Sequence, residues 1–171
     1  NVYRECLRLC GLERDVELHA MADLPAFTGL GSSSAFTVSL LHALHSFKGE
    51  FLSPLDLAYE AIHVERHVLH DRVGCQDQVM AALGGFNVLE FRGEADVVVT
   101  RLPILPGRLR EFEAHLFIVF TGITRRAADQ VARLIDRIPA NGDALRRMHA
   151  MVEQGAGILA GSGPLEAFGE L

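Results

Sequence analysis

The sequence is short of cysteine and of positive charge, and it contains no long apolar run. Three cysteines without metal-ligand spacing exclude a cysteine-based metal site and indicate a reducing compartment, the cytoplasm. The net charge of −6 argues against nucleic acid and against an anionic membrane as partners. No apolar stretch approaches ~20 residues, so no membrane span is expected. With 49% hydrophobic residues among 171, the composition fits a soluble enzyme domain with a sizeable core.

What the sequence does contain is a run of small residues, Pro25–Ala35, that opens directly into an apolar helix. The residues before it, Val16–Ala20, are typical of a short strand. Glycines let an anion approach the unpaired N–H groups of a helix N-terminus, and three consecutive serines add hydroxyl groups. The loop is therefore predicted to hold a phosphate. The alternative is a plain capped helix, for which one serine would be enough.

Two better-known phosphate loops do not fit this run. It lacks the Gly-Lys-Ser/Thr of the Walker P-loop. Gly29 and Gly31 supply the G-x-G of the dinucleotide fingerprint, but Ser34 stands where that pattern needs its third glycine. A different kind of phosphate loop is therefore expected.

A second segment, Glu65–Gln78, carries two carboxylates among polar neighbours. Glu65 lies near the end of a helix that begins at Ser53-Pro54, and Asp77 follows the Gly74 turn. In phosphoryl transfer, one carboxylate can hold magnesium and the other can orient and deprotonate a hydroxyl group. Taken singly, each carboxylate is as well explained as a cap or a solvated residue at a helix end.

Together, the two segments resemble the GHMP kinases, a family that includes galactokinase, homoserine kinase, mevalonate kinase and the heptose-phosphate kinases. Pro25–Ala35 fits the family pattern Pro-x-x-x-Gly-Leu-Gly/Ser-Ser-Ser-x-Ala without a gap, and Glu65…Gly74-x-x-Asp77-Gln78 fits a second one. The resemblance implies ATP as cofactor, Asp77 as catalytic residue, and magnesium shared by Ser33 and Glu65. It also implies a set of phosphate-binding residues, namely Pro25, Gly29, Leu30, Gly31, Ser32, Ser33 and Ser34.

Two further stretches, Gly84–Asn87 and Phe120–Arg125, resemble the heptose-phosphate branch of the family. The substrate implied is a sugar or sugar phosphate, closest to a heptose 7-phosphate. The implied substrate-binding residues are Thr121, Gly122 and Arg125. Two alternatives stay open: a GHMP kinase acting on fucose or galactose, and a non-catalytic nucleotide-binding module. Cys75 departs from the branch, whose members often carry lysine there.

Periodicity and turn residues predict six longer helices and four strands. The predicted helices cover residues 2–10, 33–47, 54–70, 76–83, 125–138 and 143–159. The predicted strands cover residues 15–20, 86–91, 96–101 and 115–120, the middle two forming a hairpin. Residues 102–108, with two prolines, are the best linker candidate, and Ser162 is a possible cap for a last short helix.

This order predicts an α+β chain with two lobes. Residues 1–101 would form the N-terminal, ATP-binding lobe of the GHMP kinase fold, and residues 102–171 the start of its C-terminal lobe. The family's first and third signatures find no match, so we expect a fragment cut at both ends. Such a fragment would have no sugar-kinase activity alone, and its uncovered second lobe would self-associate as a homo-oligomer.

Three histidines near Glu65 and two N-terminal cysteines are predicted to have structural roles. His63, His67 and His70 cluster at helical spacing, but Val64 stands where a zincin motif needs glutamate. A solvated helix face is therefore favoured over zinc binding. Cys6 and Cys10 lie one helical turn apart and are expected to pack in the core.

Overall fold

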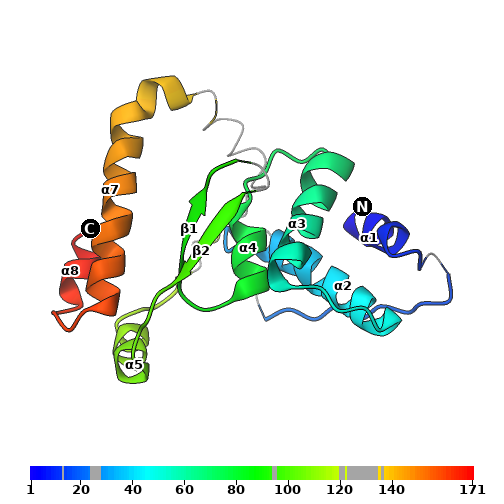
Figure 1. Ribbon diagram of the computed structural model, residues 1–171, viewed down its shortest axis with the longest axis horizontal. Coiled ribbons are helices and arrows are strands. Elements are labelled where there is room, and N and C mark those ends of the chain that lie inside the picture. The colour runs from blue at the N-terminus through cyan, green and yellow to red at the C-terminus, as the bar shows by residue number, and fades with distance from the viewer. Residues whose placement is uncertain (13, 24–27, 94–95, 120–121, 123–134, 136) are drawn as a thin grey trace. The chain divides into compact units, whose positions relative to one another are not determined.

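A computed structural model describes residues 1–12, 14–23, 28–93, 96–119, 122, 135 and 137–171 (Figure 1). The chain divides into two compact units, which are described separately. The first comprises residues 1–84 together with 122–134, and the second comprises residues 85–121 and 135–171.

The first unit is helical in its described part. Four α-helices and one π-helix follow in chain order: α1 (Val2–Leu9), α2 (Ser32–Lys48), α3 (Pro54–His63), η1 (Val64–Val68) and α4 (Gln76–Leu83). The predicted helices over residues 2–10, 33–47 and 76–83 are confirmed to within a residue or two. The helix predicted over 54–70 is confirmed only to His63, because its last turn widens into the π-helix η1.

Local capping explains where α2 ends and where α3 begins. Gly49 adopts a left-handed conformation (φ +75°), and the Glu50 N–H donates to the His45 carbonyl, as in a Schellman ending. The Ser53 hydroxyl then accepts the Asp56 N–H at 3.2 Å, with Pro54 in the first turn of α3. The helix start predicted at Ser53-Pro54 is therefore confirmed.

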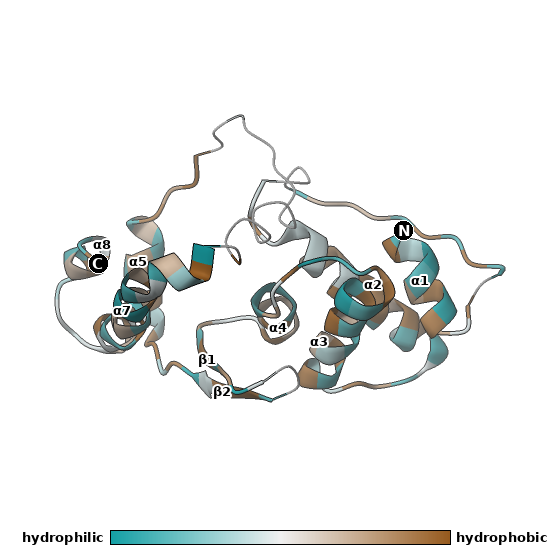
Figure 2. Ribbon diagram, turned by 90° about the horizontal axis from the view of Figure 1, so that it is seen from above, coloured by the Kyte–Doolittle hydropathy of each residue, from teal (hydrophilic) through white to brown (hydrophobic). Residues whose placement is uncertain are grey.

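The core of the first unit lies between α1, α2, α3 and η1. It consists of buried apolar side chains that recur at helical spacing along these elements: Cys6, Cys10, Val38, Leu40, Leu41, Leu44, Leu57, Ala61 and Val64. Figure 2 shows apolar and polar residues alternating around α1 in this way. Burial raises the pKa of the Cys6 thiol to about 12, which fits the packing role predicted for it.

In its described part, the second unit joins a hairpin to three α-helices and a 3₁₀ turn. Its elements are β1 (Asn87–Phe91), β2 (Val97–Arg101), α5 (Pro106–Ala114), η2 (Ile138–Asn141), α7 (Gly142–Ala160) and α8 (Glu166–Gly169). β1 and β2 are antiparallel, with Leu89 opposite Val99, which confirms the predicted hairpin and the α+β class. Phe112 is the centre of a small core, with its ring 5.7 Å from Phe86 and 5.2 Å from Phe168.

Two predicted strands are wrong. Residues 15–20 and 115–119 form no strand, and most of their side chains are exposed. Phe120, the last residue of the second predicted strand, lies outside the described residues. A strand needs a neighbouring backbone with which to exchange hydrogen bonds. Among the described residues, β1 and β2 pair only with each other, so these two segments have no partner strand.

The linker and the last helices also need correction. Residues 106–108 of the predicted linker belong to α5, because Pro106 occupies the first turn of a helix, where its missing N–H costs nothing. The helix predicted over 143–159 is confirmed as α7. The last helix, α8, is preceded by Leu165 rather than capped by Ser162. Most of the helix predicted over 125–138 lies outside the described residues, and Ile138 belongs to η2.

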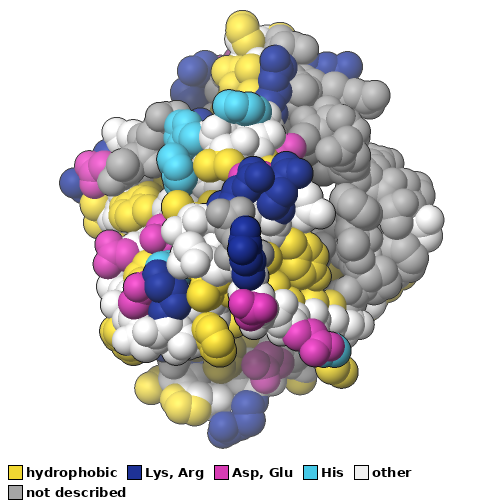
Figure 3. Space-filling view, turned by 90° about the vertical axis from the view of Figure 1, so that its right-hand side faces the viewer, with side chains coloured by type: hydrophobic (Ala, Val, Ile, Leu, Met, Phe, Trp, Pro, Cys, Tyr) yellow, Lys and Arg dark blue, Asp and Glu magenta, His cyan; other side chains and the backbone are white. Residues whose placement is uncertain are grey.

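The surface mixes apolar and charged side chains. On the face shown in Figure 3, exposed hydrophobic groups lie between basic, acidic and histidine side chains. None of the described helices is both long and apolar enough to span a membrane.

Candidate active site

The predicted phosphate loop leads into the N-terminus of α2. Gly29 and Gly31 both have left-handed backbone conformations, with φ of +81° and +68°. Gly31 is the last residue before the helix, and its carbonyl accepts the Ala35 N–H at 2.9 Å. Leu30 is half exposed, while Pro25 lies outside the described residues.

This helix start differs from that of α3 in a way that suits an anion. α3 is capped by the Ser53 hydroxyl and carries Asp56 in its first turn. Among the described residues, α2 has neither a side-chain cap nor an acidic residue in its first turn. The N–H groups of its first turn and the positive end of its dipole are therefore available to bind an anion.

Glu65 lies behind the loop as a buried carboxylate, with only 3% of the residue exposed. Its Oε2 accepts hydrogen bonds from Ser34 Oγ at 3.0 Å and from the Gln78 side-chain amide. Its Oε1 accepts a 2.7 Å hydrogen bond from Thr37 Oγ1. Because a buried charge is costly unless it is hydrogen-bonded, these three donors are what allow Glu65 to be buried there.

The π-helix η1 is the element that carries Glu65. The Leu69 N–H donates to the Val64 carbonyl at 2.9 Å, five residues back, where an α-helix would bond four residues back. Single π-helical turns are rare in proteins, but those that do occur often lie at functional sites. The backbone irregularity therefore coincides with one of the two carboxylates that the sequence singled out.

The three loop serines have different environments. Ser34 is buried and donates to Glu65, Ser32 is partly buried, and Ser33 is exposed. Thr37 Oγ1 also lies 3.1 Å from the Ser33 carbonyl oxygen, so the one proton of this hydroxyl is shared between Ser33 and the closer Glu65. The serine that contacts Glu65 is therefore the neighbour of the one predicted to share magnesium with it, and the Ser33–Glu65 metal pair stays a prediction.

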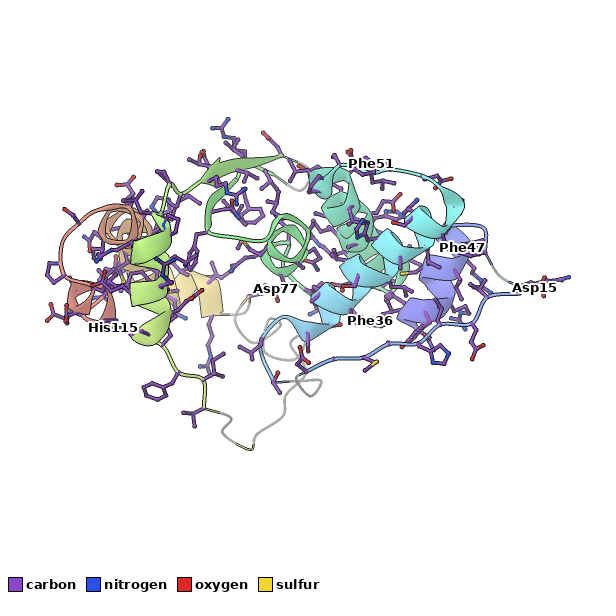
Figure 4. The ribbon with its side chains drawn as sticks, turned by 90° about the horizontal axis from the view of Figure 1, so that it is seen from below. Asp15, Phe36, Phe47, Phe51, Asp77 and His115 are labelled. Carbon is purple, nitrogen blue, oxygen red and sulfur yellow. The ribbon has the colours of Figure 1, made fainter. Side chains whose placement is uncertain are left out.

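Asp77, at the start of α4, approaches the phosphate loop. A Cβ atom built on Gly31 would lie 3.2 Å from the Asp77 Cγ and 3.3 Å from its Oδ2. Figure 4 shows Asp77 on the side of α4 that faces the beginning of α2, away from Phe47 at the other end of that helix. Asp77 is exposed, so its carboxylate is accessible to a substrate beside the loop.

The segment between the two carboxylates brings a positive charge to Cys75. Arg66 Nη1 lies 3.2 Å from the Cys75 Sγ, and Cys75 is the residue immediately before α4. Cys75, the residue that departs from the heptose-phosphate pattern, is therefore next to a guanidinium group.

The structure does not assemble the predicted substrate residues. Thr121 and Arg125 lie outside the described residues, and Gly122 is exposed with φ +74°. Their role stays a prediction.

The histidine cluster is a surface feature. His63, His67 and His70 are exposed, and the rings of the first two are 5.5 Å apart. In the described part of the chain, no group of three or more His, Cys, Asp or Glu side chains is arranged to hold a metal ion.

The sequence motifs assigned no role to two residues of this site, Thr37 and Gln78. Both are buried polar side chains, with 0% and 1% of the residue exposed, and both donate to Glu65. Thr37 stands between Phe36 and Val38 in an apolar helix, which was the one available sign that it has a polar partner.

Comparison with known proteins finds sequence similarity over this part of the chain. Residues 1–85 match the GHMP kinases N terminal domain. The chain is 38% identical to the D-glycero-alpha-D-manno-heptose 7-phosphate kinase of Campylobacter jejuni, over 66% of this chain and 33% of that enzyme. It is 29% identical to the mevalonate kinase of Methanothermobacter thermautotrophicus, over 78% of this chain and 41% of that enzyme.

The chain thus spans between a third and two-fifths of the curated relatives it matches. The matched N-terminal domain contains the loop before α2, the buried Glu65 and the exposed Asp77. By its N-terminal half, the chain belongs to the GHMP kinase family.

Proposed function

We propose that this chain is part of an ATP-dependent sugar kinase, which transfers the γ-phosphate of ATP to a hydroxyl group of a sugar phosphate. The observation that carries the proposal is the contact between Asp77 and Gly31, which brings an exposed carboxylate to the edge of an uncapped, glycine-rich helix N-terminus. An anion-binding loop and a proton acceptor side by side are the two parts that phosphoryl transfer to a hydroxyl requires.

In this proposal the loop residues Gly29 to Ser34 hold the phosphates of ATP through backbone N–H groups and serine hydroxyls. Asp77 accepts a hydrogen bond from the acceptor hydroxyl and takes its proton as the oxygen attacks the γ-phosphorus. The bond to the leaving β-phosphate oxygen breaks, and ADP is released. Positioning and charge neutralisation supply most of the acceleration.

The residues around Glu65 fit magnesium in their chemistry. They offer a carboxylate and serine hydroxyls, which are the hard oxygen ligands that this ion prefers. Three donors occupy the Glu65 carboxylate, which leaves about one of its four acceptor positions, on Oε1. Bound magnesium would neutralise phosphate charge, and Glu65 with Ser33 or its neighbour Ser34 would hold it.

The similarity to a heptose 7-phosphate kinase supports a heptose 7-phosphate as substrate. Thr121, Gly122 and Arg125 are proposed to contact its hydroxyl or phosphate groups, since arginine pairs well with phosphate. A cytoplasmic enzyme is consistent with three free cysteines, two of them buried.

The test is an ADP-release assay on the full-length protein with ATP, magnesium and a panel of acceptors. The panel contains a heptose 7-phosphate, galactose, fucose and mevalonate. We expect the highest kcat/KM on the heptose phosphate. A preference for galactose or fucose would assign another sugar-kinase activity. Tight ATP binding without turnover of any acceptor would instead identify a non-catalytic nucleotide-binding module.

A further inference from the structure

The Glu65 carboxylate joins three separate elements of the first unit. Glu65 itself lies on η1, Thr37 on α2 and Gln78 on α4. Thr37 donates to Oε1, whereas Gln78 and Ser34 donate to Oε2, so the carboxylate is held at both oxygens by groups from two helices, α2 and α4. A carboxylate held at both oxygens cannot rotate about its terminal bond, and its free acceptor position points in one fixed direction.

The two donors also lie close to the reacting parts of the site. Thr37 is one helical turn after Ser33, whose carbonyl it contacts at 3.1 Å. Gln78 is the residue next to Asp77 in α4. The same carboxylate therefore ties the start of the helix that carries the phosphate loop to the start of the helix that carries Asp77.

Gln78 is poorly explained by stability alone. Its side-chain Oε1 is buried and has no hydrogen-bond partner among the described residues. An unsatisfied buried acceptor costs about 1–3 kcal/mol, which an apolar side chain of the same length would avoid. The carboxamide is therefore kept at this position for what it does to Glu65.

We propose that Thr37 and Gln78 are positioning residues: they fix the Glu65 carboxylate and, through it, set the phosphate loop against Asp77. The inference rests on the proposed kinase function, in which Glu65 faces magnesium. Neither residue touches the reacting atoms. Both act through Glu65, as outer partners that orient a metal ligand do.

The test compares Gln78→Met with Gln76→Met in the full-length protein. The two substitutions are chemically identical and lie two residues apart on α4, but Gln76 is exposed and Gln78 is buried. The first readout is calorimetric binding of a non-hydrolysable ATP analogue at increasing magnesium concentration. The second is the separation of kcat from the KM for the sugar.

For Gln78→Met we expect the half-saturating magnesium concentration to rise about 10- to 100-fold and kcat to fall in parallel, with the sugar KM little changed. Thr37→Val keeps the shape of the side chain, removes the donor to Oε1, and should shift the magnesium titration in the same direction. Gln76→Met should match the wild type. Thermal unfolding of each variant shows whether a weaker magnesium response comes from a misfolded protein or from a mispositioned Glu65 carboxylate. If Gln78→Met does not fold, the magnesium titration of Thr37→Val tests the inference.

The inference would be overturned if Gln78→Met and Thr37→Val both fold and both show the same magnesium titration as the wild type. A loss of thermal stability with no change in magnesium dependence would also overturn it. An inactive wild-type protein is a different result. It would remove the proposed kinase function, while the binding titrations would still show whether Thr37 and Gln78 control magnesium-dependent nucleotide binding.

Discussion

The carboxylate of Asp77 occupies the space that a side chain on Gly31 would need. A Cβ atom at Gly31 would lie 3.2 Å from the Asp77 Cγ, closer than ordinary van der Waals contact. Gly31 therefore serves two purposes. It takes the left-handed backbone conformation at the start of α2, and it leaves room for the proposed proton acceptor to reach the phosphate loop.

The first prediction compares Gly31→Ala with Gly29→Ala. Both positions have positive φ, so each alanine should cost about 1–2 kcal/mol of backbone strain. Only at Gly31 does the new methyl group meet Asp77, because nothing lies within 4 Å of a Cβ at Gly29. We expect kcat of the full-length enzyme to fall at least about tenfold further in Gly31→Ala than in Gly29→Ala. Equal losses would mean that the contact with Asp77 has no part in the reaction.

The second prediction concerns the charge of Asp77. Asp77→Asn keeps the size of the side chain but removes the proton acceptor. We expect turnover to fall about a hundredfold or more, while the affinity for ATP changes little. Steady-state kinetics and equilibrium nucleotide binding measure the two quantities separately. Near-normal turnover in this variant would exclude Asp77 as the group that faces the acceptor hydroxyl.

The third prediction concerns Glu65→Gln, which removes a buried charge that three donors satisfy. The free energy of unfolding should fall by about 1–3 kcal/mol. The new amide group would place an N–H donor opposite side chains that are themselves donors, so a buried polar group would be left without a hydrogen bond. Magnesium-dependent nucleotide binding should weaken and recover in part at excess magnesium. An unchanged magnesium titration in the folded variant would show that Glu65 is a structural residue only.

The fourth prediction is a pH dependence that comes from His45. Its ring is buried, which by itself lowers the pKa, but hydrogen bonds to Glu50 and Glu60, both 2.7 Å long, outweigh burial and raise the pKa above its ordinary 6.5. The protonated ring therefore stabilises the fold fully below pH 6.5, and this contribution is lost as pH rises through the folded-state pKa.

Thermal unfolding of residues 1–171 at a series of pH values measures this effect. The unfolding temperature of the wild type should decrease as pH rises above 6.5. In His45→Gln that decrease should be smaller, because the side chain no longer titrates. Parallel pH profiles of the two proteins would contradict the prediction.

The fifth prediction concerns the segment after α5. Leu116, Phe117, Ile118 and Val119 are consecutive and between 55% and 85% exposed. An unpaired apolar segment of this kind favours association with another chain. Residues 1–171 should therefore sediment as oligomers. Ile118→Lys should shift the population towards monomer, whereas Phe51→Lys, at an exposed aromatic residue of the first unit, should not. A monomeric wild-type protein would contradict the prediction.

Local signals predicted much of the fold. The Ser53-Pro54 start of α3, the limits of α4 and the β1–β2 hairpin follow from caps, glycines and alternating residues that lie within each element. The linker predicted around Pro106 is partly wrong because a proline can begin a helix as well as break one. Residues 15–20 and 116–119 have the composition of strands, but pairing depends on residues far away in the sequence.

The site was predicted in its parts but not in its connections. Motifs pointed to the loop, to Glu65 and to Asp77, and the contact of Gly31 with Asp77 agrees with grouping them. Motifs did not reveal that Ser34 rather than its neighbour contacts Glu65, nor that Thr37 and Gln78 hold the carboxylate. Those facts depend on how three helices pack, and on a π-helical turn for which the sequence carries no local sign.

That turn makes the length of the chain between Ser53 and Gly74 matter as much as its chemistry. A π-helical turn takes in about one residue more than an α-helical turn. Removing a single residue from Val64–Val68 would allow regular α-helix to re-form while the residues after the deletion keep nearly the same direction, because a wide turn of about five residues and an α-helical turn of about four rotate the chain by about the same angle. The same deletion within α3 would rotate everything after it by about 100° around the helix axis. In an alignment, a one-residue gap at Val64–Val68 would therefore remove the wide turn at Glu65 and leave the direction of the segment that leads to Asp77 almost unchanged.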